Sequence, residues 1–142
     1  MRIRIVAVGK LKERALREVL DDYLGRIRRY APVEELELRD ASGFERALAT
    51  DERVVALEVN GEALTSRALA TRVAEWGEVG KGRVSFLIGG AEGIPAAVSR
   101  AAQHRLSLSS MTLPHRLARV LLAEQLYRAF TILRGEPYAR ED

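Results

Sequence analysis

Val84-Ser85-Phe86-Leu87-Ile88 runs directly into Gly89-Gly90-Ala91-Glu92-Gly93, and this stretch decides the fold class. Its first half carries no charge, which is typical of a strand that is buried on both faces of a sheet. The glycines end the strand, and a helix is predicted to follow from about Pro95 to Gln103. A buried strand, a glycine loop and a helix in this order are the repeating unit of a parallel α/β sheet.

The same alternation of strand and helix extends over the whole chain. Strands are predicted at Arg2–Val8, Val33–Leu38, Arg53–Val59, Val84–Ile88 and Arg105–Leu108. Helices are predicted at about Lys12–Arg29, Ser42–Ala49, Thr65–Trp76, Pro95–Gln103 and Arg116–Arg134, with Ser42 and Thr65 as caps. Asn60-Gly61 predicts a turn, and Gly77, Gly80 and Gly82 predict a loop. We therefore expect one α/β domain with a parallel sheet over residues 1–142.

Composition bounds the class of protein. Hydrophobic residues make up 47% of the 142 residues and charged residues 30%, which favours one globular domain over a disordered chain. The absence of cysteine excludes a disulfide framework, a thiolate nucleophile and a Cys-ligated metal, and no metal-ligand spacing is present, so no metal is expected. Charges interrupt the apolar run at the N-terminus, so we expect no membrane span and a soluble, cytoplasmic protein.

The charge balance permits a polyanionic partner. The chain has 23 basic and 20 acidic residues, a formal net charge of +3. Basic residues gather in two groups: Lys10, Lys12, Arg14 and Arg17, followed by Arg26, Arg28 and Arg29. One interpretation is a solvated helix face. The other is an edge that binds RNA phosphates, with Lys10 and Lys12 as RNA-binding residues.

The final predicted helix has apolar residues on nearly every side. Its one compact polar stripe is Glu124, Arg128 and Thr131. A helix that covers only its own core has a clear polar half. We therefore expect a homodimer in which this helix, through a residue such as Leu122 or Leu126, faces a second copy of the chain.

Ligands of an open parallel sheet bind beyond the carboxyl ends of its strands, which here means the loops after Leu57, Ile88 and Leu108. The Gly89–Gly93 loop lacks the spacing of a dinucleotide fingerprint or a Walker A motif, but its glycines let backbone approach a ligand closely. The Ser109–Leu113 loop mixes apolar side chains with small hydroxyls, which suits an adenosine. Viewed alone, each loop is equally an ordinary connection.

Single residues leave two interpretations open. His104 and His115 are either structural or, for His115, a possible base. Arg119 either forms a salt bridge or faces a ligand. Tyr138 and Arg140 lie in a tail after Pro137, which has a role only if a pocket holds it.

Together these segments resemble the ribosomal RNA large subunit methyltransferase H family, which belongs to the SPOUT class. The resemblance runs end to end and is dense from Val84 onward. It rests on Val6–Gly9, Leu87–Gly93, Leu106–Ser109, Thr112–His115, Arg119–Leu121, Ala123–Ala129 and Pro137-Tyr138.

The resemblance implies a SPOUT-like parallel sheet with a C-terminal trefoil knot and a homodimer. It implies methyl transfer from S-adenosylmethionine to N3 of a pseudouridine in 23S rRNA, on the assembled ribosome. The cofactor-binding positions that it implies are Leu57, Gly89, Leu108, Ser109, Ser110, Met111, Thr112 and Leu113.

The tail departs from the family pattern. Family members end Pro-Tyr-His-Arg-Glu, whereas this chain has Ala139 in place of the histidine. N3 of a pseudouridine lies between two carbonyls and must lose a proton before or during attack. We expect Tyr138 and Arg140 to position the RNA, and Arg140 or Arg119 to stabilise the anionic base. His115 is the remaining catalytic candidate.

Two rival functions follow from the same residues. One is a non-catalytic module of the same fold that binds the ribosome or RNA, for which Ala139 is the hint. The other is a nucleotide-binding α/β protein that uses the Gly89 loop for phosphate.

Overall fold

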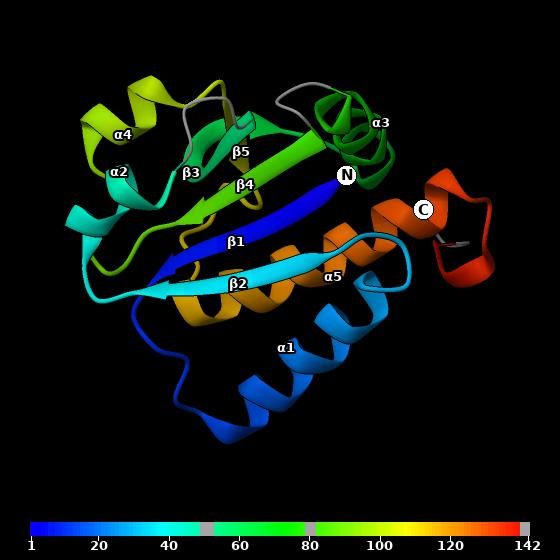
Figure 1. Cartoon of the computed structure of the whole chain (residues 1–142), viewed down its shortest axis with the longest axis horizontal. Coiled ribbons are helices and arrows are strands. Elements are labelled where there is room, and N and C mark those ends of the chain that lie inside the picture. Colours follow the sequence, from blue (N-terminus) through cyan, green and yellow to red (C-terminus); the bar gives the residue numbers. More distant parts are fainter. Residues whose placement is uncertain (49–52, 79–81, 140–142) are drawn as a thin grey trace.

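Five parallel strands form one sheet in the order β2-β1-β4-β3-β5 (Figure 1). The structure is a computed structural model that describes residues 1–48, 53–78 and 82–139. The strands are β1 (Arg2–Val8), β2 (Val33–Leu38), β3 (Arg53–Ala63), β4 (Arg83–Ile88) and β5 (His104–Ser107). The predicted fold class, a parallel α/β sheet, is therefore confirmed.

Helices cover both faces of this sheet. They are α1 (Arg14–Ile27), α2 (Phe44–Ala47), α3 (Ser66–Gly77), α4 (Ala96–Ala101) and α5 (His115–Leu133), with short 3₁₀ turns η1 (Ala41–Gly43) and η3 (Pro137–Ala139). In Figure 1, α1 and α5 lie on one side of the sheet, and α2 and α4 lie on the other. Helix α5 packs between α1 and α3.

Side chains along β1 alternate between two hydrophobic cores, one on each face of the sheet. Ile3 and Ile5 of β1 point to the large core, which α1, α3 and α5 cover. Val6, the next residue after Ile5, points to the smaller core, which Phe44 of α2 and Val98 of α4 cover. Because both faces are buried, the strands read as apolar runs, as the sequence of β4 predicts.

The structure corrects three local predictions. Asn60-Gly61 is not a turn: both residues lie within β3, whose pairing with β5 shifts register between Leu57 and Glu62. Asp40, not Ser42, caps the turn before α2, because its carboxylate accepts from the Ser42 amide. The last strand, predicted at Arg105–Leu108, is β5 (His104–Ser107), so His104 is its first residue and packs against Trp76 with ring centroids 5.0 Å apart. Gly80 of the predicted loop and Ala49, the predicted end of the short helix, fall outside the described residues.

The polar stripe of α5 also differs from the prediction. Glu124 and Arg128 form the predicted pair at 2.9 Å, but Thr131 is fully buried. Leu122 and Leu126 are fully buried within their own subunit, so neither can face a second copy. The exposed apolar residues of α5 are Leu117, Leu121 and Leu133.

Candidate functional site

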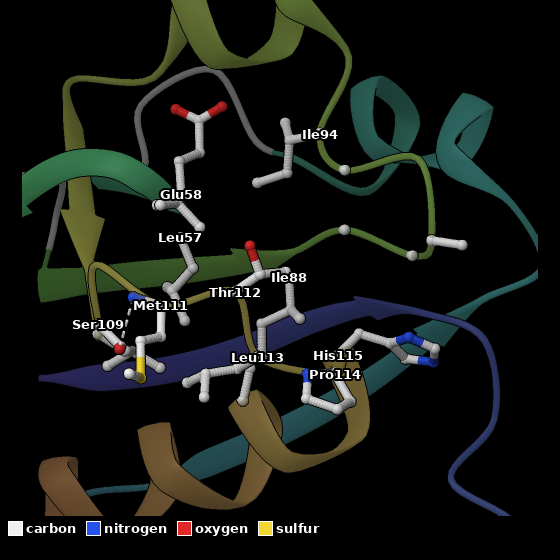
Figure 2. Close-up of a pocket in the computed structure, with 17 residues that line it drawn as sticks. Leu57, Glu58, Ile88, Ile94, Ser109, Met111, Thr112, Leu113, Pro114 and His115 are labelled. Atoms are coloured by element: carbon white, nitrogen blue, oxygen red, sulfur yellow. Dashed lines mark hydrogen bonds between the residues drawn. The ribbon is translucent and has the colours of Figure 1, made fainter.

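A cavity of about 700 Å³ lies at the carboxyl ends of β4 and β5, beside Leu57–Val59 in the middle of β3 (Figure 2). The segments that follow β4 and β5 form its walls together with this part of β3, and the first turn of α5 closes it with His115 and Ala118. This is the edge at which an open parallel sheet binds ligands. The three segments that were expected to carry the chemistry therefore meet in one pocket, although the one after Leu57 continues β3 and is not a loop.

Seven of the eight predicted cofactor-binding positions line this cavity: Leu57, Gly89, Leu108, Ser109, Met111, Thr112 and Leu113. Ser110 is exposed and is not among the lining residues. Figure 2 shows Glu58 and Ile94 along one side of the cavity, and Leu113, Pro114 and His115 along the other. Thr112 lies between the two sides.

The loop after β4 needs glycine for its own closure. A Cβ at Gly89 would lie 2.4 Å from the carbonyl carbon of Gly93, where the neighbouring atoms are backbone and cannot move aside. Gly93 has a φ of 77° and donates its amide to the Gly90 carbonyl oxygen at 3.0 Å. The glycine at position 89 is thus required by the folded-back loop, rather than only by an approaching ligand as the sequence suggests.

The loop after β5 is fixed by its own serines. Ser107 Oγ donates to the Ser109 carbonyl oxygen at 3.0 Å, and Ser109 Oγ accepts from the Met111 amide at 2.9 Å. These local bonds hold the backbone of the loop against the cavity. Leu108 and Leu113 supply apolar surface there, so the wall can take a flat aromatic ring and bond its polar edge to the backbone.

Glu58 is a site residue that the sequence analysis missed. Among the described residues that line the cavity, it is the one acidic side chain, and its Oε2 accepts from Ser99 Oγ of α4 at 2.8 Å. It directly follows Leu57 at the point where the pairing of β3 with β5 is interrupted. An acidic residue just after a predicted ligand-side position was the available signal.

His115 and Arg119 start the same helix but have different surroundings. His115 lines the cavity, whereas Arg119 is fully buried. Arg119 Nη1 donates to Glu35 at 3.0 Å and to Glu37 at 2.5 Å, and Nη2 donates to the Gly9 carbonyl oxygen at 3.0 Å. The structure therefore supports the salt-bridge interpretation of Arg119 and gives it no exposed surface for a substrate.

Tyr138 lies far from the cavity of its own chain. Its hydroxyl donates to Glu124 Oε2 at 2.8 Å, and its ring packs edge-on against Tyr127 with centroids 4.5 Å apart. Glu124 and Tyr127 follow His115 by nine and twelve residues, or about 14 and 18 Å along a helix. Burial and the bond to Glu124 raise the pKa of Tyr138, so the phenol is neutral near pH 7. Ala139 is buried, and Arg140 lies outside the described residues.

Lys10 and Lys12 are exposed between β1 and α1. Arg14 pairs with Glu18, and Arg17 with Asp21 and Glu35. Of the first basic group, Lys10 and Lys12 therefore have no ion-pair partner within residues 1–48, 53–78 and 82–139, and their charges are available to a ligand.

The described residues contain neither a metal-binding cluster nor a membrane-spanning helix. No three His, Cys, Asp or Glu side chains among them gather in a way that could hold a metal ion. None of the helices in this part of the chain is long and apolar enough to cross a membrane.

Comparison with known proteins places the chain in a family. The family model described as predicted SPOUT methyltransferase matches residues 1–139. A ribosomal RNA large subunit methyltransferase H from Sorangium cellulosum is 54% identical, with 98% of this chain and 99% of the relative covered. The proteins of the same name from Anaeromyxobacter dehalogenans and Bifidobacterium animalis are 45% and 44% identical, each over 97% of this chain and 99% of the relative.

A solved structure shares the fold. A probable methylase family protein from Haemophilus influenzae matches with a TM-score of 0.60 at 14% identity, over 98% of this chain and 69% of that one. This likeness concerns the fold alone. The family model and the full-length relatives show that the chain belongs to the SPOUT methyltransferases, in the ribosomal RNA large subunit methyltransferase H family.

Proposed function

We propose that this protein methylates N3 of a pseudouridine in 23S rRNA, on the assembled ribosome and with S-adenosylmethionine as methyl donor. The observation that carries the proposal is the cavity at the ends of β4 and β5, beside Leu57–Val59 of β3, in a chain whose family modifies ribosomal RNA. Because ribosomes are the substrate, we place the protein in the cytoplasm. The trefoil knot of the SPOUT class is part of the same proposal.

The residues of the cavity fit the methyl donor. Its volume of about 700 Å³ lies in the range of small-molecule sites. Leu57, Leu108 and Leu113 offer apolar walls to an adenine, and the backbone of the Ser109 loop offers polar partners to its edge. The carboxylate of Glu58 suits the hydroxyl or ammonium groups of the same molecule. When bound, S-adenosylmethionine supplies an electrophilic methyl group on its sulfonium.

The protein's own task is to hold the base and to remove its N3 proton. His115 is the candidate base at the cavity, because it lines it at the start of α5. The neutral Tyr138, whose one hydroxyl hydrogen goes to Glu124, is suited to pack against RNA, not to accept the proton. We assign to Arg140 the stabilisation of the anionic base.

A homodimer would reconcile the positions of His115 and Tyr138. In one subunit the cavity lies at the start of α5, and the tail packs against Glu124 and Tyr127, farther along the same helix. If two α5 helices pack with their directions opposed, the tail of one subunit approaches the cavity of the other. Leu117 and Leu121, one helical turn apart and 39% and 43% exposed, are the residues that this contact would cover.

The RNA contacts that we propose begin with Lys10 and Lys12. Both are exposed and lack ion-pair partners in the described structure, so phosphates can take their place. A net charge of +3 supports few such contacts, so the ribosome must supply further binding surface.

Mass mapping of 23S rRNA tests the proposal. The purified protein and S-adenosylmethionine are incubated with ribosomes that lack the modification, and in parallel with protein-free 23S rRNA. One methyl group on a pseudouridine in ribosomes, with much less in free RNA, is the expected result. Methylation of another base, or equal methylation of free RNA, would contradict the corresponding part of the proposal.

Ala139 favours one alternative, a module that binds the ribosome without catalysis. Its side chain is buried, whereas a catalytic tail histidine would have to reach the substrate. Calorimetry separates the functions: the enzyme binds S-adenosylmethionine, the module does not, and a nucleotide-binding protein prefers ATP.

A further inference from the structure

Arg119 is buried at a junction of three elements. Its guanidinium, on α5, reaches two carboxylates of β2 and the carbonyl oxygen of Gly9 at the end of β1. Its Nε has no hydrogen-bond partner among the described residues. A buried cation of this kind adds little net stability compared with an apolar side chain, so what it holds in place matters more than its energy.

The network holds the segment Gly9–Glu13. Glu37 Oε2, which accepts from Arg119, also accepts from the Leu11 amide at 2.8 Å. At the far end of the segment, Glu13 pairs with Arg116 of α5 at 2.9 Å. Both ends of the segment are thus tied to the first turns of α5.

The same turns of α5 carry the cavity wall. His115 and Ala118 line the cavity, and Arg116 and Arg119 are their neighbours in the helix. The buried side chain of Leu11 anchors the segment in the large core, while Lys10 and Lys12, on either side of Leu11, are exposed. The geometry fixes both lysines relative to the cavity.

We propose that Arg119 is a positioning residue for RNA: it fixes Gly9–Glu13 on α5 so that Lys10 and Lys12 meet the phosphates beside the target base. The inference rests on the proposed function. It removes Arg119 from the residues that contact the base and gives it an effect on ribosome binding instead.

Steady-state methylation of ribosomes tests the role with Arg119→Met, which keeps length without charge, and Arg119→Lys, which keeps charge without the two-pronged geometry. Each should raise the KM for ribosomes about tenfold, with kcat within about twofold, through lost phosphate contacts. The Kd for S-adenosylmethionine should stay within about twofold. Arg72→Met, which breaks an exposed pair with Glu62 of β3, two strands away from β1 in the sheet, is the matched control and should change neither constant.

A mutant cycle separates positioning from general stability. Lys10→Gln with Lys12→Gln should raise the KM by a similar factor, and adding Arg119→Met should raise it by less than about twofold more, because the lysines it positions are gone. If the two effects multiply in full, or if the Kd for S-adenosylmethionine rises with the KM, the role is overturned.

Amide hydrogen exchange gives a readout that does not depend on activity. In Arg119→Met, exchange of residues 9–13 should become about tenfold faster, while exchange of residues 89–93 is unchanged. Unchanged exchange of residues 9–13 overturns the positioning role. If the wild type methylates no ribosomes, the proposed function fails, and the exchange result still decides what Arg119 holds.

Discussion

The hydroxyl of Tyr138 donates a 2.8 Å hydrogen bond to Glu124 Oε2, and Arg128 also donates to that oxygen, at 2.9 Å. The Glu124 carboxylate thus pairs with Arg128 of its own helix and also binds Tyr138 of the tail that follows this helix. The position of the tail is therefore set by α5 itself.

Tyr138→Phe tests the role of this bond. The variant should lose about 1.5 kcal/mol of unfolding free energy, the lower end of what a hydrogen bond to a charged acceptor contributes, and should lower single-turnover methylation on saturating ribosomes several-fold. Tyr30→Phe is the matched control, because Tyr30 makes a similar bond to Glu136 at 2.6 Å. An equal loss of turnover in both variants would show that the effect is one of stability.

Leu121→Glu should convert the proposed dimer into folded monomers. The residue is 43% exposed, so a charge there costs little in a single subunit but much in an apolar contact. Sedimentation at micromolar concentration measures the result. Val19→Glu, at an equally exposed position of α1, should leave the mass unchanged, and Leu122→Glu should prevent folding because Leu122 is fully buried. A monomeric wild type contradicts the dimer.

Gly89→Ala should abolish S-adenosylmethionine binding measured by calorimetry. The added Cβ would meet the backbone of Gly93 and Ile94 within 2.7 Å, so the loop must open. Gly25→Ala in α1 is the control, because a Cβ added at Gly25 would meet nothing within 4 Å. This variant should keep wild-type affinity, with its free energy of unfolding raised by up to about 1 kcal/mol. Wild-type affinity in Gly89→Ala would refute the assignment of this loop.

Glu58→Gln should weaken S-adenosylmethionine binding about tenfold, because an amide replaces the one carboxylate that lines the cavity. Glu62→Gln is the control, since Glu62 lies on the same strand but pairs with Arg72. Calorimetry of both variants decides. Unchanged affinity in Glu58→Gln would mean that the carboxylate serves only Ser99.

Glu37 gives the fold an acid-sensitive contact. Burial alone would raise its pKa, but the bonds from the Leu11 amide and Arg119 outweigh burial, so the pKa lies below the ordinary 4.5. Because the pKa of Glu37 is lowered by folding, its contribution to the free energy of unfolding is present above pH 4.5 and is lost as the pH falls through the pKa of the folded state. Urea unfolding should show wild type more stable than Glu37→Gln at pH 7, with the difference shrinking below about pH 4. A difference that grows on acidification contradicts this linkage.

Local patterns carry much of the fold. The uncharged stretch Val84–Ile88 predicts a doubly buried strand, and Thr65 predicts the start of α3, where its Oγ1 accepts from the Ala68 amide. Asn60-Gly61 misled because a turn signal is local, whereas pairing with β5 is not. There Gly61 serves a close approach, since a Cβ would lie 2.7 Å from the backbone of Leu106.

The candidate site divides in the same way. The loops after β4 and β5 are predictable, because parallel strands bring their carboxyl ends to one edge, whereas the continuation of β3 past Leu57 is not. The burial of Arg119 is not, because its partners Glu35 and Gly9 stand 84 and 110 positions earlier in the chain. Likewise, the apolar circumference of α5 does not say which side is internal, and only packing between α1 and α3 shows that Leu122 and Leu126 are.

The place of α5 between α1 and α3 also orders events during synthesis. Helices α1 and α3 are synthesised before α5, which packs between them. Until α5 leaves the ribosome, the core that contains Leu20 and Leu69 is incomplete, and Glu35 and Glu37 lack their ion pair with Arg119. The nascent chain therefore has to remain unaggregated until α5 has been made, and this helix completes the core as well as the site.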